Sequence, residues 1–345
     1  MSTPSRPSLV RHWLALAEEL VGRAAPRLDA LNLFPVPDAD TGTNMLATLT
    51  AARTAADACP AQDDAGAVLA HAGAAALDSA RGNSGMLLAV SLAGMAEPLR
   101  GRERVDAFAL AAAFGAADRA ARQALSDPRE GTILTVLSAA ARSLARSSTQ
   151  APDTPAVAGD ADPAVRLGPA VTLMLADCVQ AVEETESLLA PLTRAHVVDA
   201  GAVGLLWVFE ALRSVVTGTP VDEELATALP GYVEGAHAAE GEPAAEPEAP
   251  TEGAVEVMGT LTLTPLAAAE LRRRLTDVGD AVILAPVGTA RDAQGRVPWR
   301  VHVHVPRAED AIGPLRAAGD VEGLAVTDLA GPSHGDAAPD GCHGR

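Results

Sequence analysis

Between residues 9 and 212, apolar residues recur at helical spacing, and short stretches bearing Gly, Pro or Asp interrupt the pattern at intervals. This periodicity predicts a run of helices, with no strong strand signal. The expected helices cover residues 12–21, 44–56, 65–77, 84–99, 105–125, 131–144, 169–189 and 202–216. Aromatic residues make up only 2% of the chain and hydrophobic residues 48%, so the core has to be built from Ala, Leu and Val. Such a core favours close-packed helices over a β-sandwich.

The composition changes after the helical stretch. Residues 236–253 are acidic, rich in Pro and nearly free of large apolar side chains, so they cannot bury enough surface to fold and are expected to be a linker. Beyond them, strands are predicted at 255–264, 281–286, 299–305 and 321–329, with helices at 265–278 and 308–317. This β-α-β-β-α-β order is typical of the ferredoxin-like fold.

These patterns predict a mainly α protein with a small α/β second domain. We expect a helical domain over residues 1–218, an acidic linker over 219–253, the α/β domain over 254–330 and a disordered tail over 331–345. Within the helical domain, residues 147–162 are rich in Ser, Thr, Pro and Asp and are expected to form a mobile loop.

The charge of the chain excludes several classes of function. The formal net charge is -19, which argues against binding to nucleic acid or to anionic lipid. The chain contains no lysine, so neither a Walker P-loop nor lysine Schiff-base chemistry is available. The three cysteines lie far apart and suggest no disulfide framework. No signal peptide or membrane-spanning run is recognised, so we expect a cytoplasmic protein without an integral membrane segment.

The most informative motif is the stretch NLFPVPDADTGTNM at residues 32–45. Its two prolines stiffen a loop, and Asp38 and Asp40 follow directly. The residues that then open a helix are Thr41, Gly42, Thr43 and Asn44. Helix capping needs only one such residue, whereas two neighbouring carboxylates are costly without a cation. Mg²⁺ suits such carboxylates, and the helix N-terminus suits a phosphate; on spacing alone, a capped loop remains equally compatible.

Three further stretches place small or polar residues at predicted helix starts. They contain Gly82, Asn83, Ser84 and Gly85, then Thr132, and then Asp199 and Gly201. Each stretch alone is more typical of a helix cap or a turn than of a ligand site. Their repetition is informative, because alternate N-termini of antiparallel helices gather at one end of a bundle and can form an anion site there.

The four stretches together resemble the ATP-binding subunit of bacterial fatty acid kinase, whose first domain is similar to the L subunit of dihydroxyacetone kinase. The resemblance covers residues 10–215 in order. It implies an antiparallel helical barrel that binds ATP and Mg²⁺. It also implies that Asp38 and Asp40 ligate Mg²⁺, and that Asn32 stands where the dihydroxyacetone kinase branch has a further metal-binding Asp. The other implied nucleotide contacts are Thr41, Gly42, Thr43, Asn44, Gly82, Asn83, Ser84, Gly85, Thr132, Asp199 and Gly201.

The second region resembles the middle domain of the same kinase, where two His and a Cys look like a zinc site. His302 and His304 are present, but Met258 stands at about the expected Cys position, and Met is a poor zinc ligand. We therefore interpret the two histidines as one face of a strand. Another departure is Ala39 in place of a glycine, which the backbone tolerates if φ is negative. A family kinase continues into a third domain, and this chain ends at Arg345.

The sequence thus leads to a kinase hypothesis. The expected protein is an Mg–ATP-dependent phosphotransferase subunit acting on an acceptor held by an acyl-binding partner. That acceptor is a fatty acid carboxylate, with dihydroxyacetone as the second choice. A nucleotide-binding regulatory or scaffold protein without turnover is the alternative. The Asp38/Asp40 motif favours the phosphotransferase, and the missing third domain favours the regulatory or scaffold protein. A helical interaction protein with capped turns is disfavoured by the four-motif match. A homodimer is compatible with the phosphotransferase and with the regulatory protein.

Overall fold

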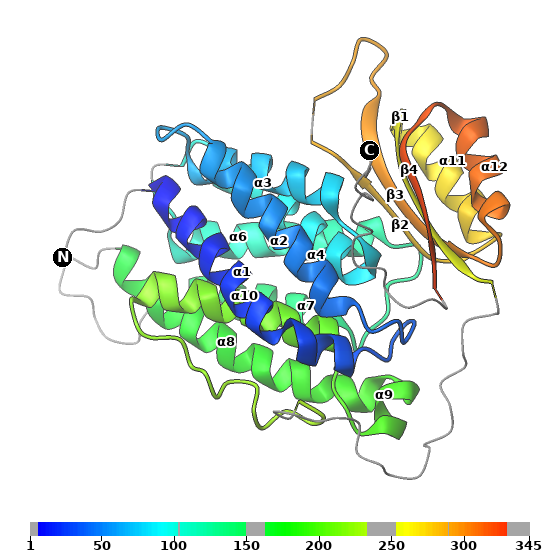
Figure 1. Ribbon diagram of the computed structural model, residues 1–345. Helices are drawn as coiled ribbons and strands as arrows, with labels where there is room; N and C mark the ends of the chain where they lie inside the picture. The colour runs from blue at the N-terminus through cyan, green and yellow to red at the C-terminus, as the bar shows by residue number, and fades with distance from the viewer. Residues whose placement is uncertain (1–5, 103, 150–162, 233–252, 289, 330–345) are drawn as a thin grey trace, which may run out of the picture.

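A computed structural model describes residues 6–102, 104–149, 163–232, 253–288 and 290–329, and shows a helical domain beside a smaller α/β domain (Figure 1). The helices of the first domain are α1 (Arg6–Leu31), α2 (Thr41–Ala58), α3 (Ala65–Ser79), α4 (Gly82–Gly94), α5 (Ala96–Leu99), α6 (Ala107–Ala124), α7 (Ile133–Thr149), α8 (Pro163–Leu188), α9 (Ala190–Ala195) and α10 (Ala200–Thr217).

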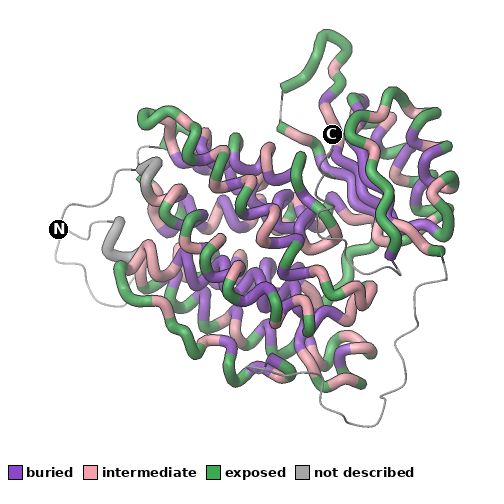
Figure 2. Tube along the Cα trace, viewed as in Figure 1, coloured by how far each residue is buried: buried purple, intermediate pink, exposed green. Residues whose placement is uncertain are grey.

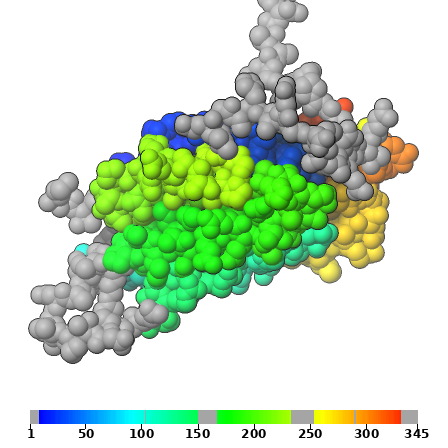
Figure 3. All heavy atoms as spheres, turned by 90° about the horizontal axis from the view of Figure 1, so that it is seen from below, coloured from blue at the N-terminus to red at the C-terminus, as the bar shows by residue number. Residues whose placement is uncertain are grey.

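The long helices form a closed ring. Helix α1 packs against α2, and contacts continue through α3, α4, α6, α7, α8 and α10, which returns to α1. The predicted antiparallel helical barrel is therefore confirmed. Its interior is one apolar cluster dominated by Leu, Ala and Val, seen as the purple inner faces in Figure 2. Seen from below, the green and yellow-green atoms of residues 163–232 form a continuous surface, with the second domain at one end (Figure 3).

Small residues let the helices approach closely. At the crossing of α3 and α4, a Cβ added to Gly73 would lie 2.6 Å from Ala93 Cα and 2.8 Å from Ala93 Cβ. No side chain larger than hydrogen fits there, because such short contacts force the helices apart. The Ala-rich composition that favoured helices therefore also sets their spacing.

Capping residues define several helix starts. Asp64 accepts from Ala67 N at 2.8 Å at the start of α3, and Asp106 accepts from Ala109 N at 2.7 Å at the start of α6. The largest differences from prediction are that α1 is much longer than residues 12–21, that the predicted helix 84–99 is divided into α4 and α5, and that α9 was not predicted. Helix α7 ends later and α8 begins earlier than predicted.

The helical domain extends beyond the predicted boundary at residue 218. Residues 219–232 pack on the bundle rather than beginning a linker, because Leu229 and Tyr232 are buried in its core. The hydroxyl of Tyr232 accepts from Trp207 Nε1 at 3.1 Å. The predicted loop at 147–162 is helical up to Thr149, at the end of α7. The rest of that loop, residues 233–252 of the predicted linker and the tail at 331–345 lie outside the described residues.

The second domain has the predicted ferredoxin-like topology. Its elements are β1 (Val255–Leu263), α11 (Pro265–Thr276), β2 (Asp280–Pro286), β3 (Val297–Val305), α12 (Ala308–Ala318) and β4 (Val321–Asp328). The strand order is β2-β3-β1-β4, and each neighbouring pair is antiparallel. Helices α11 and α12 cover one face of the sheet (Figure 1).

The other face of the sheet is buried against the helical bundle. Met258, Ile283 and Ala285 belong to the core cluster of the first domain. Ser126 N donates to Val282 O at 3.0 Å, which joins the end of α6 to the edge strand β2. The two domains therefore share a continuous apolar contact.

Among the described residues, α10 alone has the length and hydropathy of a membrane span. Within its 18-residue window, 72% is buried inside the protein. This helix packs in the ring between α1 and α8, so its apolar character is accounted for by the core.

Replacing Gly73 by Ala is expected to lower the free energy of unfolding by about 2 kcal/mol, because overpacking a close contact typically costs about 1–3 kcal/mol. Gly115 in α6 is the matched control: a Cβ there meets only the tip of Arg119, at 3.4 Å. Gly115→Ala should be neutral or stabilising by up to about 1 kcal/mol, the gain in helix propensity. Urea unfolding of both variants measures the difference; equal effects would contradict the close crossing.

Candidate functional site

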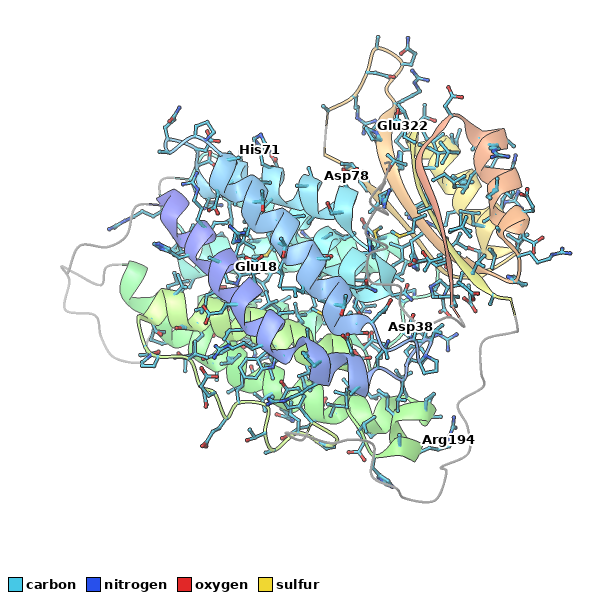
Figure 4. The ribbon with its side chains drawn as sticks, viewed as in Figure 1. Glu18, Asp38, His71, Asp78, Arg194 and Glu322 are labelled. Atoms are coloured by element: carbon cyan, nitrogen blue, oxygen red, sulfur yellow. The ribbon has the colours of Figure 1, made fainter. Side chains whose placement is uncertain are left out.

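Asp38 and Asp40 lie on the loop that joins α1 to α2. The loop contains a cis peptide bond between Phe34 and Pro35. Asn32, buried at its start, donates from Nδ2 to Asp38 Oδ1 at 2.5 Å. Figure 4 shows Asp38 at the end of the bundle that faces the second domain. The loop therefore presents its carboxylates toward the domain interface.

The start of α2 is capped by a residue that the sequence did not single out. Asp29 Oδ1 accepts from Gly42 N at 2.6 Å and from Thr43 N at 3.1 Å, and Thr43 Oγ1 donates to Asp29 Oδ2 at 2.7 Å. Asp40 stands at the N-cap position but makes no side-chain cap bond. Capping thus does not account for Asp40, although the loop itself leads into a capped helix.

The two carboxyl groups are poorly solvated and close to each other. Burial, above all, raises the pKa of Asp38. Burial and then the charge of Asp38 raise the pKa of Asp40 to about 7. Such a pair resists losing both protons unless a cation compensates the second charge. The geometry therefore favours a bound cation with oxygen ligands, for which Mg²⁺ is suited.

The N-terminus of α4 lies beside this loop. Eight predicted site residues line one small cavity: Asn32, Asp38, Asp40, Thr41, Asn44, Gly82, Asn83 and Ser84. Gly82 has φ 58, and a Cβ there would lie 2.5 Å from Asn44 Nδ2. This close approach needs a glycine. The cavity thus combines two carboxylates with helix N–H groups, which are donors that bind phosphate.

The other predicted residues lie outside that cavity. Gly42 and Thr43 are engaged by Asp29, and a Cβ on Gly85 would lie 2.8 Å from Thr48 Oγ1, so Gly85 serves packing. Thr132 Oγ1 donates to Arg129 O at 2.8 Å in the turn before α7. Among the described residues, no contact joins any of these four to Asp38.

Asp199 and Gly201 nevertheless bring α10 close to α4. A Cβ on Gly201 would lie 2.9 Å from Ser84 Oγ. Asp199 caps α10 by accepting from Ala202 N at 2.8 Å, and burial raises its pKa to about 7. Helix N-termini therefore gather at one end of the bundle, as the sequence pattern suggested, but Asp199 itself acts as a buried cap.

The second domain contributes to the same cavity. His304 lines it, and Glu256 Oε1 accepts from Gly82 N at 3.0 Å. Glu256 lies opposite His304 in the register of β1 and β3. Sequence analysis missed Glu256, because no local pattern links β1 to the start of α4.

The Cys expected of a zinc site is absent from the second domain, where Met258 stands at about its position. Glu256, His302 and His304 form a buried cluster whose ligand atoms lie within 4.8 Å of one another, close enough to hold a metal ion. His302 Nε2 lies 2.8 Å from Glu256 Oε1. Met258 pairs with His302 in the strand register and packs in the core.

Within this cluster, Glu256 lies against both histidines, and the pKa values of Glu256 and His304 are strongly shifted. Burial alone would raise the pKa of Glu256, but His302, His304 and the Gly82 N–H hold it at about 2. Burial and then His302 lower the pKa of His304 to about 3, so His304 is uncharged at neutral pH. Glu256 therefore brings a permanent negative charge to the start of α4.

Known proteins share the helical domain. A model of the DAK2 domain family matches residues 35–214, just over half of the chain. The chain belongs to the DAK2 domain family. Protein YloV of Bacillus subtilis is 33% identical over 211 residues, 61% of this chain and 35% of YloV. Protein SH1689 of Staphylococcus haemolyticus is 32% identical over 198 residues, 57% of this chain and 33% of that protein. The chain thus spans about a third of the length of these relatives.

One solved structure aligns with part of the chain. The dihydroxyacetone kinase of C. freundii aligns with a TM-score of 0.40 and 19% identity, covering 62% of this chain and 36% of that one. Family membership supports a phosphotransferase-like function.

The substitution at Ala39 is strained. Its φ is 54, in the left-handed region, so the negative φ considered from the sequence is wrong. Alanine costs about 1–2 kcal/mol in that region, whereas glycine costs about 0.5–1 kcal/mol in lost entropy. Ala39→Gly should therefore stabilise the DAK2 domain by about 0.5–1 kcal/mol. Thermal unfolding measures this, with Ala51→Gly inside α2 as a control that should destabilise by about 1 kcal/mol. A destabilised Ala39→Gly would contradict the strain.

The raised pKa of Asp40 predicts a pH dependence. Because the folded state raises this pKa from 3.8 to about 7, folding opposes ionisation, and stability falls as pH rises through that window. Without Mg²⁺, Asp40→Asn should therefore be more stable than wild type by on the order of 1 kcal/mol near pH 8, with no gain near pH 4. Urea unfolding with a chelator tests this, and Asp57→Asn on the same helix is the control. A gain of equal size at both pH values would contradict the burial of the charge.

Proposed function

We propose that this chain is an Mg–ATP-dependent phosphotransferase subunit that phosphorylates an acceptor held by a partner protein. A fatty acid carboxylate is the acceptor we favour, and dihydroxyacetone is the second choice. The single observation that carries the proposal is the half-buried pair of Asp38 and Asp40 beside the N-terminus of α4, for which no helix cap or ion pair among the described residues accounts.

Each residue has a definite role in this proposal. Asp38 and Asp40 would hold Mg²⁺, which supplies charge neutralisation for the transferring phosphoryl group. Asn32 orients Asp38 through its amide N–H. The backbone N–H groups at Asn83 and Ser84 would bind phosphate oxygens, because the first turn of a helix leaves such donors free.

The acceptor class is chosen on chemical grounds. The cavity at Asp38 is about 20 Å³, enough for about one water molecule, so in the described arrangement it holds neither a nucleotide nor an acceptor. A carboxylate acceptor needs no general base, since it is already ionised at neutral pH, and this supports the fatty acid over dihydroxyacetone.

The second domain has to move for a nucleotide to enter. Small-molecule sites occupy about 300–1,000 Å³, far more than the present cavity. Glu256 also places a carboxylate on Gly82 N, a position that suits a phosphate oxygen. We therefore interpret the described arrangement as a closed state in which Glu256 competes with the nucleotide.

A nucleotide-binding regulatory or scaffold protein is the alternative. It would use the same carboxylates and helix N-termini but would transfer no phosphate. Binding and turnover must therefore be measured separately.

Titration calorimetry of the full chain with ATP, with and without Mg²⁺, tests the proposal. Wild type should bind only with Mg²⁺, and the double variant Asp38→Asn/Asp40→Asn should lose binding at least about tenfold, since each charged ligand contributes about 1.5–3 kcal/mol. Glu256→Gln should bind more tightly than wild type. Asp57→Asn is the control and should bind as wild type does. Circular dichroism confirms that each variant is folded.

Two outcomes would overturn parts of the proposal. Absence of binding by folded wild type would exclude both the kinase and the regulatory function. Mg²⁺-dependent binding without ADP formation, when a fatty-acid-loaded partner is supplied, would support the regulatory alternative.

A further inference from the structure

A second, larger cavity lies at the domain interface away from Asp38. It has a volume of about 420 Å³ and opens between α3, α4 and α6 of the bundle and α11, β2 and β3 of the second domain. It shares no lining residue with the Asp38 cavity. Its size falls in the range of about 300–1,000 Å³ that holds small molecules.

The walls of this cavity are almost entirely apolar. They include Leu77 and Val90 from the bundle and Leu284 from β2. Three of the lining side chains carry polar groups, Gln123, Arg272 and Trp299, and Arg272 alone among them is charged. Such a cavity suits a ligand with an apolar body and few polar atoms.

The surroundings of Arg272 are unusual for a guanidinium. Its Nη1 donates to Gln123 O at 2.7 Å and its Nη2 to Leu284 O at 3.1 Å. Its Nε is buried and has no hydrogen-bond partner. No carboxylate forms an ion pair with it among the described residues. A partly buried charge without a counter-ion is destabilising, and burial lowers the pKa of Arg272.

The neighbouring arginines on the same helix show the contrast. Arg273 lies 3.6 Å from Asp277, and Arg274 lies 2.5 Å from Glu270. The chain has 45 acidic and 26 basic residues, so acidic partners are plentiful. Arg272 alone of the three faces the cavity and lacks a carboxylate in this part of the structure.

We propose that the cavity binds an amphipathic carboxylate, with its alkyl chain along the apolar walls and its carboxylate on the guanidinium of Arg272. The apolar lining excludes water from the chain, which stabilises binding in proportion to the buried area. The carboxylate supplies the counter-ion that Arg272 lacks, through charge-assisted hydrogen bonds. The site does not depend on nucleotide binding, because the two cavities are separate.

Calorimetric titration of the full chain with decanoate, below its aggregation concentration, tests the site. Wild type should bind one decanoate, while acetate, which lacks the chain, and decanol, which lacks the charge, should each bind at least about tenfold more weakly. Trp299 lines the cavity, so its fluorescence should change on binding and report the location.

Two variants separate ligand binding from a purely structural role of Arg272. Ala269 is exposed and lines the cavity, so Ala269→Phe should fill it and abolish binding without breaking the interface. Arg272→Gln should weaken decanoate at least about tenfold while leaving decanol unchanged. Arg273→Gln is the matched control and should bind as wild type does.

The proposal is overturned by either of two results. One is the absence of saturable decanoate binding by folded wild type, which would leave Arg272 as a tie between the domains. The other is binding that Ala269→Phe and Arg272→Gln both leave unchanged, which would place the ligand elsewhere. ATP binding by the same samples, measured separately, bears only on the nucleotide site.

Discussion

The burial of one sheet face against the helical ring is the interaction on which the rest of the structure depends. Helices α11 and α12 cover only one side of the second domain, and its other side would expose Met258, Ile283 and Ala285 to water. Burying these side chains on the bundle removes that cost. Both cavities lie along this contact, so the chemistry of each draws on residues from two domains.

At this contact, the pKa values of neighbouring carboxyl groups are shifted in opposite directions. Burial raises the pKa values of Asp38 and Asp40, whereas two histidines and a backbone N–H hold that of Glu256 at about 2. Arg300 of β3 is also buried, and this burial lowers the pKa of its guanidinium, whereas the charge of Asp78 at the end of α3 raises it. Asp78 is labelled in Figure 4. The interface thus keeps charged groups where apolar packing alone would exclude them.

Much of this fold could be predicted from the sequence, because helical periodicity and the strand pattern are local. The long helices and all four strands appear near their predicted positions, and the motif around Asp38 carries its own family resemblance. The partners of those residues could not be predicted. Asp29 caps α2 from the last turns of α1, where it looks like any surface Asp. Glu256 meets Gly82 across 174 residues of chain, and only the folded arrangement of two domains joins them.

The ring of helices is closed by its first and last members. Helix α1 ends at Leu31 and α10 begins at Ala200, yet the two pack side by side. During vectorial synthesis, α1 emerges from the ribosome long before α10 exists, so the part of its apolar face that packs on α10 stays uncovered until nearly the whole domain has been made. The α/β domain contrasts with this, since its strands pair within a short length of chain. Folding of the helical domain is therefore expected to be a late, cooperative event that follows translation of α10.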